Sequence, residues 1–205
     1  MTLQIDDAFI AEWEPKYDTV ANDENQYHKI LAAVLSDMHA EGRLSSATFL
    51  AIWRWKGAMR VIHRVRLGEY ESRYAPAFRR AASEPPELKL HALLGEGRKL
   101  PGLGAPMASA ILHFMHPDCI PIIDVRTVGV LFEARAPDGR SLIATRQCDL
   151  RHYEEFRQAI LAIQNGSPGR CLRQIDRALF AYHSLVTSPL TCNSARLDSR
   201  WRLRR

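Results

Sequence analysis

The apolar residues of this chain recur mostly at the three- and four-residue spacing of amphipathic helices, and the alternating pattern of strands is nearly absent. The clearest apolar stripe consists of Tyr27, Ile30, Leu31, Val34, Leu35 and Met38. Asn22 precedes the stripe and is a favourable helix N-cap, and Gly42 follows it and is a favourable helix end. The pattern predicts one long helix between these two residues.

The same spacing predicts helices along most of the rest of the chain. The next helix begins at Ser45 or Ser46 and is interrupted by Gly57. Further helical stretches cover 69–82, 87–94, 107–115, 125–132, 150–164 and 171–185. The turn sequence Pro137-Asp138-Gly139 predicts a loop over 134–149. We therefore predict an all-α fold of about eight or nine helices.

The length of 205 residues fits one globular domain, which we expect over residues 1–188. Residues 189–205 are polar and basic, so we expect them to form a flexible tail. No apolar run approaches the roughly 20 residues that span a bilayer, and the acidic N-terminus lacks the pattern of a signal peptide. We expect a cytoplasmic protein that is a monomer.

The four cysteines are scattered through the chain and form no C-x-x-C pair: Cys119, Cys148, Cys171 and Cys192. This spacing predicts neither a zinc site nor an iron–sulfur cluster, and a cytosolic chain of this size rarely has a disulfide framework. We expect free thiols, no metal and no cofactor.

The charge of the chain is unevenly distributed. Residues 1–45 hold three basic and nine acidic side chains, a net charge of −6. Residues 46–195 hold twenty basic and thirteen acidic side chains, and the last ten residues hold five arginines and one aspartate. An acidic start and a basic remainder favour a polyanion as partner at one face, although a basic tail is also common at solvated chain ends.

The most informative segment begins with Leu100-Pro101-Gly102-Leu103-Gly104 between two helical stretches. Glycine permits positive φ and close approach, and we expect Leu103 to pack into the core and fix the turn. Pro106 lies in the first turn of the next helix, where the missing N–H costs nothing. The free amides at this bend favour an anion such as a phosphate, whereas the alternative is an ordinary glycine-capped turn.

The second half of the segment is Pro121-Ile122-Ile123-Asp124, which leads into the helix over 125–132. The two halves together resemble the helix-hairpin-helix DNA glycosylase superfamily, of the type of endonuclease III and the mismatch adenine glycosylase. The resemblance runs without a gap over residues 100–131. It implies a two-lobed orthogonal helical bundle with a helix-hairpin-helix at about 87–115, and a partner that is double-stranded DNA.

The resemblance also implies roles for individual residues. The backbone contact to DNA falls on Leu100, Gly102, Leu103, Gly104, Ala105 and Met107, with Lys99 and Arg126 as phosphate-contacting side chains. Asp124 occupies the slot of the aspartate that assists cleavage of the bond between base and sugar, the first step of base-excision repair. A carboxylate suits this role because it stabilises an oxocarbenium-like sugar or orients a water. Asp124 is equally a favourable N-cap with no catalytic role.

Bifunctional members of this superfamily carry a Schiff-base lysine in the slot that Pro106 occupies here. Proline has no amine, so the resemblance implies a monofunctional glycosylase without lyase activity. It also implies no iron–sulfur cluster, because the cluster cysteines have no counterpart in this chain. A flipped base is usually held by aromatic rings, for which Trp53 and Trp55 are the candidates. Two residues two positions apart cannot share one helix face, and packing of both in the core is the alternative.

Three functions remain open from the sequence. The first is a monofunctional DNA glycosylase that uses Asp124. The second is a non-catalytic DNA-binding protein that keeps the scaffold, in which Asp124 is only a cap. The third is a helical interaction module whose hairpin contacts protein. The sequence does not specify the base, because the pocket residues lie on helices distant in the chain.

Overall fold

The computed structural model describes residues 2–136 and 139–187, and the regular elements within them are helices joined by loops. The α-helices are α1 Asp7–Trp13, α2 Tyr17–Val20, α3 Glu24–Glu41, α4 Ser46–Trp55, α5 Ala75–Ser83, α6 Pro86–Leu94, α7 Ala105–Met115, α8 Val125–Glu133, α9 Leu150–Gly166 and α10 Leu172–Tyr182. The β-structure in this part of the chain is one isolated bridge between Arg135 and Ser141. The predicted all-α class is therefore confirmed. The predicted tail over 189–205 lies outside the described residues.

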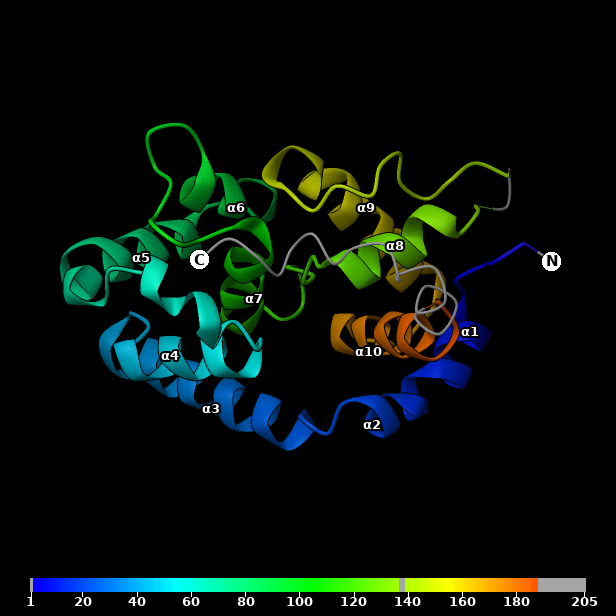
Figure 1. The fold of residues 1–205 in the computed structure, drawn as a ribbon, viewed down its shortest axis with the longest axis horizontal. Coiled ribbons are helices and arrows are strands. Elements are labelled where there is room, and N and C mark those ends of the chain that lie inside the picture. Colours follow the sequence, from blue (N-terminus) through cyan, green and yellow to red (C-terminus); the bar gives the residue numbers. More distant parts are fainter. Residues whose placement is uncertain (1, 137–138, 188–205) are drawn as a thin grey trace, which may run out of the picture.

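The helices form two groups that lie side by side (Figure 1). Helices α3 to α7 make up the group on the left of the view, and α1, α2, α8, α9 and α10 make up the group on the right. Helix α1 packs against α10, so the two ends of the described chain belong to the same group. The chain enters the first group through α3 and leaves it through the segment between α7 and α8. Residues brought to the junction therefore come from distant parts of the sequence.

Helix α7 is the centre of the first group and packs against α3, α4, α5 and α6. Most of its side chains are buried, from Ala105 at its start to Phe114 near its end. A helix that is apolar on nearly all faces is stable only when other helices surround it. This burial fixes the start of α7, which the candidate site uses.

Several helices begin or end at residues that favour helix ends in the local sequence. Gly42 ends α3 in the left-handed conformation with φ +62°, as predicted. The Ser45 side chain caps α4 by accepting a hydrogen bond from the Thr48 amide at 3.2 Å. Gly57 follows α4 with φ +68° and turns the chain sharply. The N-cap of α3 is Asp23 rather than the predicted Asn22.

Two stretches differ from the predicted helices. Residues 69–82 are helical, as predicted, but a π-helical turn over Tyr70–Tyr74 leads directly into α5 and places Pro76 in the first turn of α5, where it is tolerated. The short helices α1 and α2 were not predicted from the pattern. In the described part of the chain, no helix combines the length and the apolar character needed to cross a lipid bilayer.

Candidate functional site

The connection between α6 and α7 covers residues 95–104 and ends in a tight bend. Gly102 has φ +77°, and a Cβ there would lie 2.8 Å from the carbonyl carbon of Arg64. Leu103 is buried in the core, as predicted, and the Tyr74 hydroxyl donates a hydrogen bond to the carbonyl of Pro101 at 2.7 Å. The bend is thus held by packing on both sides. It begins where the sequence predicted, because α6 ends at Leu94, and it is two residues shorter than predicted, because α7 begins at Ala105.

The start of α7 presents unpaired backbone donors. Among the described residues, the N–H groups of Gly104 and Ala105 have no acceptor, and Pro106 has no N–H. These residues line a cavity of about 350 Å³ together with Lys99 and Arg151. Gly104 itself has φ −109° and is not required by the backbone conformation. Unpaired amides at a helix start attract anions.

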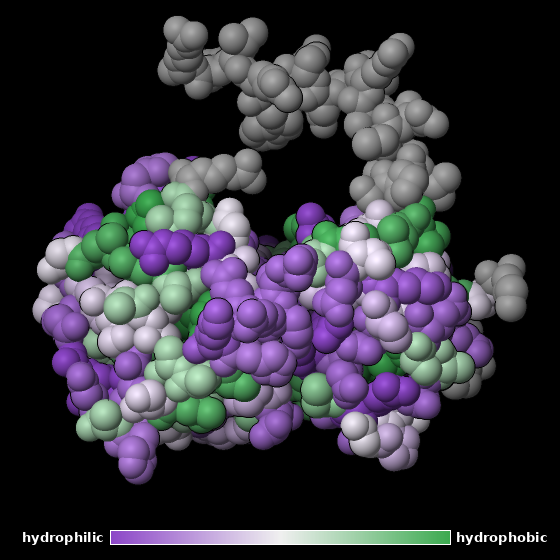
Figure 2. Space-filling view, turned by 90° about the horizontal axis from the view of Figure 1, so that it is seen from below, coloured by the Kyte–Doolittle hydropathy of each residue, from purple (hydrophilic) through white to green (hydrophobic). Residues whose placement is uncertain are grey.

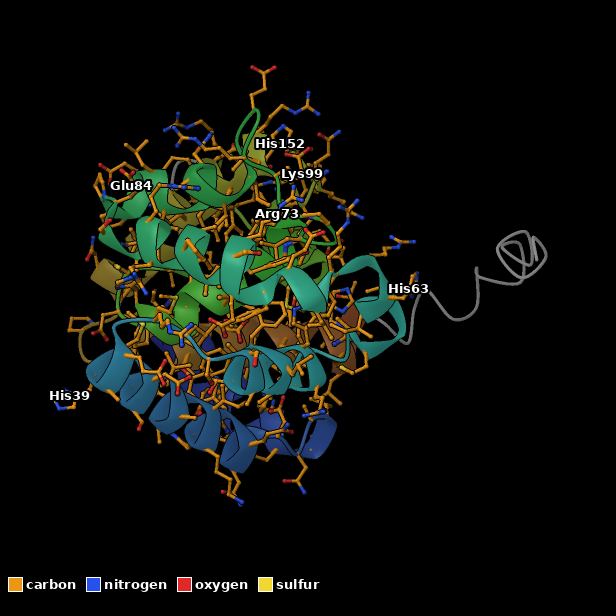
Figure 3. All side chains as sticks on the ribbon, turned by 90° about the vertical axis from the view of Figure 1, so that its left-hand side faces the viewer. His39, His63, Arg73, Glu84, Lys99 and His152 are labelled. Atoms are coloured by element: carbon orange, nitrogen blue, oxygen red, sulfur yellow. The ribbon has the colours of Figure 1, made fainter. Side chains whose placement is uncertain are left out.

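The side chains predicted to contact DNA at this bend differ in accessibility. Leu100, Leu103, Ala105 and Met107 are buried, so only their backbone can meet a ligand. Lys99 is exposed, and Figure 3 shows it in the upper part of the view, between Glu84 on the left and His63 on the right.

Asp124 is the N-cap of α8 in an extended conformation. Its Oδ1 accepts hydrogen bonds from the amides of Arg126 at 2.9 Å and Thr127 at 3.0 Å. The Thr127 hydroxyl oxygen in turn accepts a hydrogen bond from the Asp124 amide, which completes a capping box. The N-cap interpretation of Asp124 is therefore confirmed. It leaves Oδ2 free of any role in the cap.

Oδ2 of Asp124 faces a lysine from the other group of helices. The Lys56 ammonium donates a hydrogen bond to it at 3.2 Å, and the two side chains are 19% and 16% exposed. Burial acts to raise the pKa of Asp124, but the Lys56 charge and the amides of Thr127 and Arg126 outweigh burial. The net pKa lies below its ordinary value of 3.8, so the carboxyl is ionised at neutral pH.

The segment before Asp124 is fixed by three side chains. Ser109 Oγ accepts a hydrogen bond from the Ile123 amide at 3.1 Å, and the Tyr153 hydroxyl donates to the Pro121 carbonyl at 3.0 Å. His113 Nδ1 lies 2.7 Å from the carbonyl oxygen of Ile120. A carbonyl only accepts, so Nδ1 carries the proton and Nε2 accepts from the Tyr27 hydroxyl. These bonds hold the Asp124 backbone in one position.

Asp124 and Lys56 line a cavity of about 480 Å³ at the junction of the two groups of helices. The other lining residues are Tyr17, Asp23, Trp55, Gly57, Val125, Arg126, Arg173, Asp176 and Phe180. Figure 2 shows the surface hollowed between the two halves of the molecule, with hydrophilic side chains over their junction. The charged lining residues comprise three aspartates, two arginines and one lysine. The cavity thus combines aromatic rings with both signs of charge.

Arg173 is the central cation of this cavity. Its guanidinium donates to Asp176 at 2.7 Å and to Glu24 at 2.8 Å. Its Cζ lies 4.9 Å from the Tyr17 ring centre and 5.4 Å from that of Trp55. Rings and carboxylates on all sides fix the guanidinium in place. Arg173 is therefore a rigid part of the cavity wall.

Asp176 is a second partly buried carboxyl group on the cavity, with a side chain that is 14% exposed. Burial raises its pKa, the nearby Asp124 charge raises it further, and Arg173 opposes both. The pKa of Asp176 is consequently above its ordinary value, whereas that of Asp124 is below it. Opposite shifts in two neighbouring carboxyls are a feature of sites that use one as acid and one as base.

The two tryptophans predicted for a base pocket occupy different places. Trp53 is 1% exposed and packs against Phe49 in the core, so it does not line the cavity. Trp55 is partly buried and lines the cavity. Arg126 forms no ion pair with Asp124, and its guanidinium lies 4.3 Å from the ring centre of Phe180. Of the residues predicted from sequence, the structure therefore brings together Asp124, Trp55 and Arg126.

Cys148 lies between the bend and the cavity around Asp124. It lines the cavity at the start of α7. Burial raises the pKa of its thiol to about 12, and the charges of Asp124 and Lys56 also act on it. The two cavities are therefore close to one another.

The sequence pattern does not indicate that Lys56, Tyr17, Arg173 or Asp176 are site residues. Lys56 directly follows Trp55, but no sequence pattern links it to Asp124, 68 positions further along the chain. Arg173 and Asp176 have a three-residue spacing that is equally typical of an exposed helical ion pair.

Comparisons with protein-family models, with curated proteins and with solved structures were made for the whole chain. No family model, no curated protein and no solved structure matches it.

Proposed function

We propose that this protein binds double-stranded DNA and cleaves the glycosidic bond of a flipped base, with Asp124 as the catalytic carboxylate. The observation that carries the proposal is the placement of Asp124. Its ionised carboxylate opens with Lys56 into an aromatic-lined cavity of about 480 Å³. A carboxylate that served only as a cap would have no need of such a cavity.

The proposed DNA contact is the bend before α7. The unpaired amides of Gly104 and Ala105 suit a phosphate, and Lys99 and Arg151 line the same cavity. Buried Leu100 and Leu103 anchor the bend, so it is already in the conformation that binds. In this proposal the two groups of helices are the lobes of a helix-hairpin-helix glycosylase, and the DNA lies across their junction.

The proposed reaction is hydrolysis of the bond between the base nitrogen and C1′ of the sugar. As this bond breaks, positive charge develops on the sugar, and the negative charge of Asp124 stabilises it. Water then adds its oxygen to C1′ and gives up a proton, while the departing base gains one. Asp124 is held for this role by the amides of Arg126 and Thr127, which fix Oδ1 and leave Oδ2 toward the cavity.

The cavity has the features expected of a pocket for a flipped base. Trp55, Tyr17 and Phe180 supply aromatic surface on which a base can stack. Val125 is 72% exposed beside Asp124, an unusual position for an apolar side chain and a suitable contact for the sugar or a neighbouring base. The proposed process is therefore base-excision repair.

The alternative is a DNA-binding protein without catalysis. One observation favours this alternative: helix capping and the ion pair with Lys56 also explain every interaction of Asp124.

One experiment distinguishes the two functions. A glycosylase releases free base from a suitable duplex and loses this activity in Asp124→Asn, whereas the alternative binds the same duplex and releases none.

A further inference from the structure

We propose that a cavity between α5 and the loop before α7 is a separate anion site, which binds a phosphate group through Arg73, Arg80 and Arg98. The cavity has a volume of about 380 Å³. It shares no lining residue with the cavity around Asp124 or with the cavity at the start of α7. The inference therefore concerns a different site from the proposed reaction and does not depend on base release.

Two of the three arginines come from one continuous helical stretch. Arg73 lies in the π-helical turn that leads into α5, and Arg80 lies in the last turn of α5. Seven positions are about two helical turns, so both side chains lie on the same face. Pro76 and Ala77 between them are small and also line the cavity. They leave a hollow between the two arginine side chains.

The third arginine comes from the loop that joins α6 to α7. The Arg98 amide donates a hydrogen bond to the Gly95 carbonyl at 2.9 Å, and Gly97 between them has φ +69°. This turn and the buried side chain of Leu100 fix the loop on either side of Arg98. The next residue, Lys99, lines the cavity at the start of α7 instead. Consecutive side chains of this loop thus line two different cavities.

The residues that line the cavity do not balance its positive charge. No carboxylate is among those that the structure describes there. Arg98 forms no ion pair or side-chain hydrogen bond with any described residue. Arg80 reaches only a backbone carbonyl of α6, at 3.4 Å. Arg73 pairs with Glu69 at 3.2 Å, but Glu69 is shared with Arg66 at the same distance. A bound anion would therefore relieve the repulsion between the three guanidinium groups.

The chemistry of the cavity favours a phosphate group as this anion. Guanidinium groups form paired hydrogen bonds to phosphate oxygens, and a phosphate monoester carries a charge of about −1.5 to −2 at pH 7. The described lining residues include no aromatic ring, so the cavity offers no surface on which a base could stack. Two sources of the group are the DNA strand bound at the neighbouring bend and a free phosphorylated molecule.

Isothermal titration calorimetry with inorganic pyrophosphate at constant ionic strength tests the site without DNA. Wild type should show saturable binding. Arg98→Ala should bind about 10-fold more weakly, which is the effect of losing one charged hydrogen-bond partner. Arg79→Ala is the matched control, because Arg79 is exposed on α5, carries the same charge and does not line the cavity. It should bind pyrophosphate as wild type does, and circular dichroism verifies that both variants are folded.

Fluorescence anisotropy with duplex DNA distinguishes the two sources of the phosphate group. If DNA supplies it, pyrophosphate should compete with the duplex. The slope of log K against log salt should then decrease in magnitude by about 0.9 in Arg98→Ala relative to Arg79→Ala. If a free molecule supplies it, the duplex should bind the two variants equally, and pyrophosphate should still bind the protein–DNA complex.

Two results of the calorimetry would overturn the arginine site. One is no saturable binding by wild type below about 10 mM pyrophosphate, and the other is equal binding by Arg98→Ala and Arg79→Ala. Base release by wild type in those cases would leave the proposed function intact. Pyrophosphate binding that Arg98→Ala weakens, together with no base release from any duplex, would instead reject the proposed reaction and retain the arginine site.

Discussion

The backbone of Arg64 lies against Gly102 so closely that a Cβ on the glycine would be 2.8 Å from the Arg64 carbonyl carbon. Gly102 also has φ +77°, which L-residues adopt only at a cost. We expect Gly102→Ala to lower the free energy of unfolding by about 2–4 kcal/mol, from left-handed strain and overlap together. Urea denaturation followed by circular dichroism measures this.

Gly104→Ala is the control for this prediction. Gly104 has φ −109°, and a Cβ there would meet only the Pro106 ring at 3.9 Å. The expected loss is below about 1 kcal/mol, because alanine is only a poorer N-cap. Equal destabilisation by the two substitutions would show that the close approach to Arg64 does not determine the bend.

Lys99 should contribute to DNA affinity through its charge alone. It is exposed next to the bend, and Lys99→Ala should weaken binding to duplexes of any sequence. The slope of log K against log salt should decrease in magnitude by about 0.9, the value for one lost phosphate contact. Lys16→Ala is the control, because Lys16 is paired with Glu12 on another surface. An unchanged slope in Lys99→Ala would remove Lys99 from the DNA interface.

Much of the helical fold was predictable because its signals are local. The apolar stripe from Tyr27 to Met38 and the residues Gly42 and Ser45 specify helix ends without reference to the rest of the chain. The short helix α1 was not evident, because it has only a few residues and is stabilised by packing on α10. The spacing of apolar residues predicts a helix that is long enough to show an apolar stripe along one face. It does not predict a short helix that is stabilised only by packing against a helix far away in the sequence.

The candidate site was predictable only in part, for the same reason. Asp124 and the glycine bend lie within one continuous segment, so their spacing was visible in the sequence. Lys56 and Arg173 reach the same cavity from α4 and α10, and their placement depends on how the two groups of helices pack. The choice between Trp53 and Trp55 likewise required the structure, because both are equally apolar.

His113 should make the stability of the protein depend on pH. Burial lowers its pKa to about 4 from the ordinary 6.5, and the Arg173 and Lys56 charges act in the same direction against the bond to Ile120. Between pH 6.5 and 4 the unfolded chain binds a proton that the folded chain does not, so stability falls as pH falls. The expected loss is about 3 kcal/mol over this range.

Urea denaturation at pH 7 and pH 5 tests this prediction by comparing wild type with His113→Gln. The difference in stability between the two should shrink at pH 5, because the variant lacks the titrating group. His63→Gln, with an exposed side chain, should follow wild type at both pH values. A constant difference between wild type and His113→Gln would contradict the prediction.

The Asp124 carboxylate should stabilise the folded protein at pH values above its ordinary pKa of 3.8. Its pKa is lowered in the folded state, so its stabilising effect is present above about pH 3.8 and is lost as pH falls through the folded-state value. Asp124→Asn keeps an oxygen for the cap but leaves Lys56 without its counter-charge. The expected cost is about 1–3 kcal/mol at pH 7.

Thermal unfolding at pH 7 and pH 3 measures the effect of Asp124→Asn. The variant should be less stable at pH 7, and the gap to wild type should narrow at pH 3. Asp149→Asn is the control, because Asp149 caps α9 in a more exposed place and does not face Lys56. If the difference in stability between wild type and Asp124→Asn were as large at pH 3 as at pH 7, the charge of the Asp124 carboxylate would not be its cause.

Base release from duplex DNA tests the role of Asp124 most directly. Duplexes with single altered or mismatched bases are incubated with wild type and Asp124→Asn, and free bases and abasic sites are quantified by mass spectrometry, with DNA binding measured in parallel. We predict release by wild type from at least one duplex and a decrease of about 100-fold or more in Asp124→Asn, with DNA binding retained. Equal release by the two proteins, or binding by wild type with no release from any duplex, would contradict a catalytic Asp124.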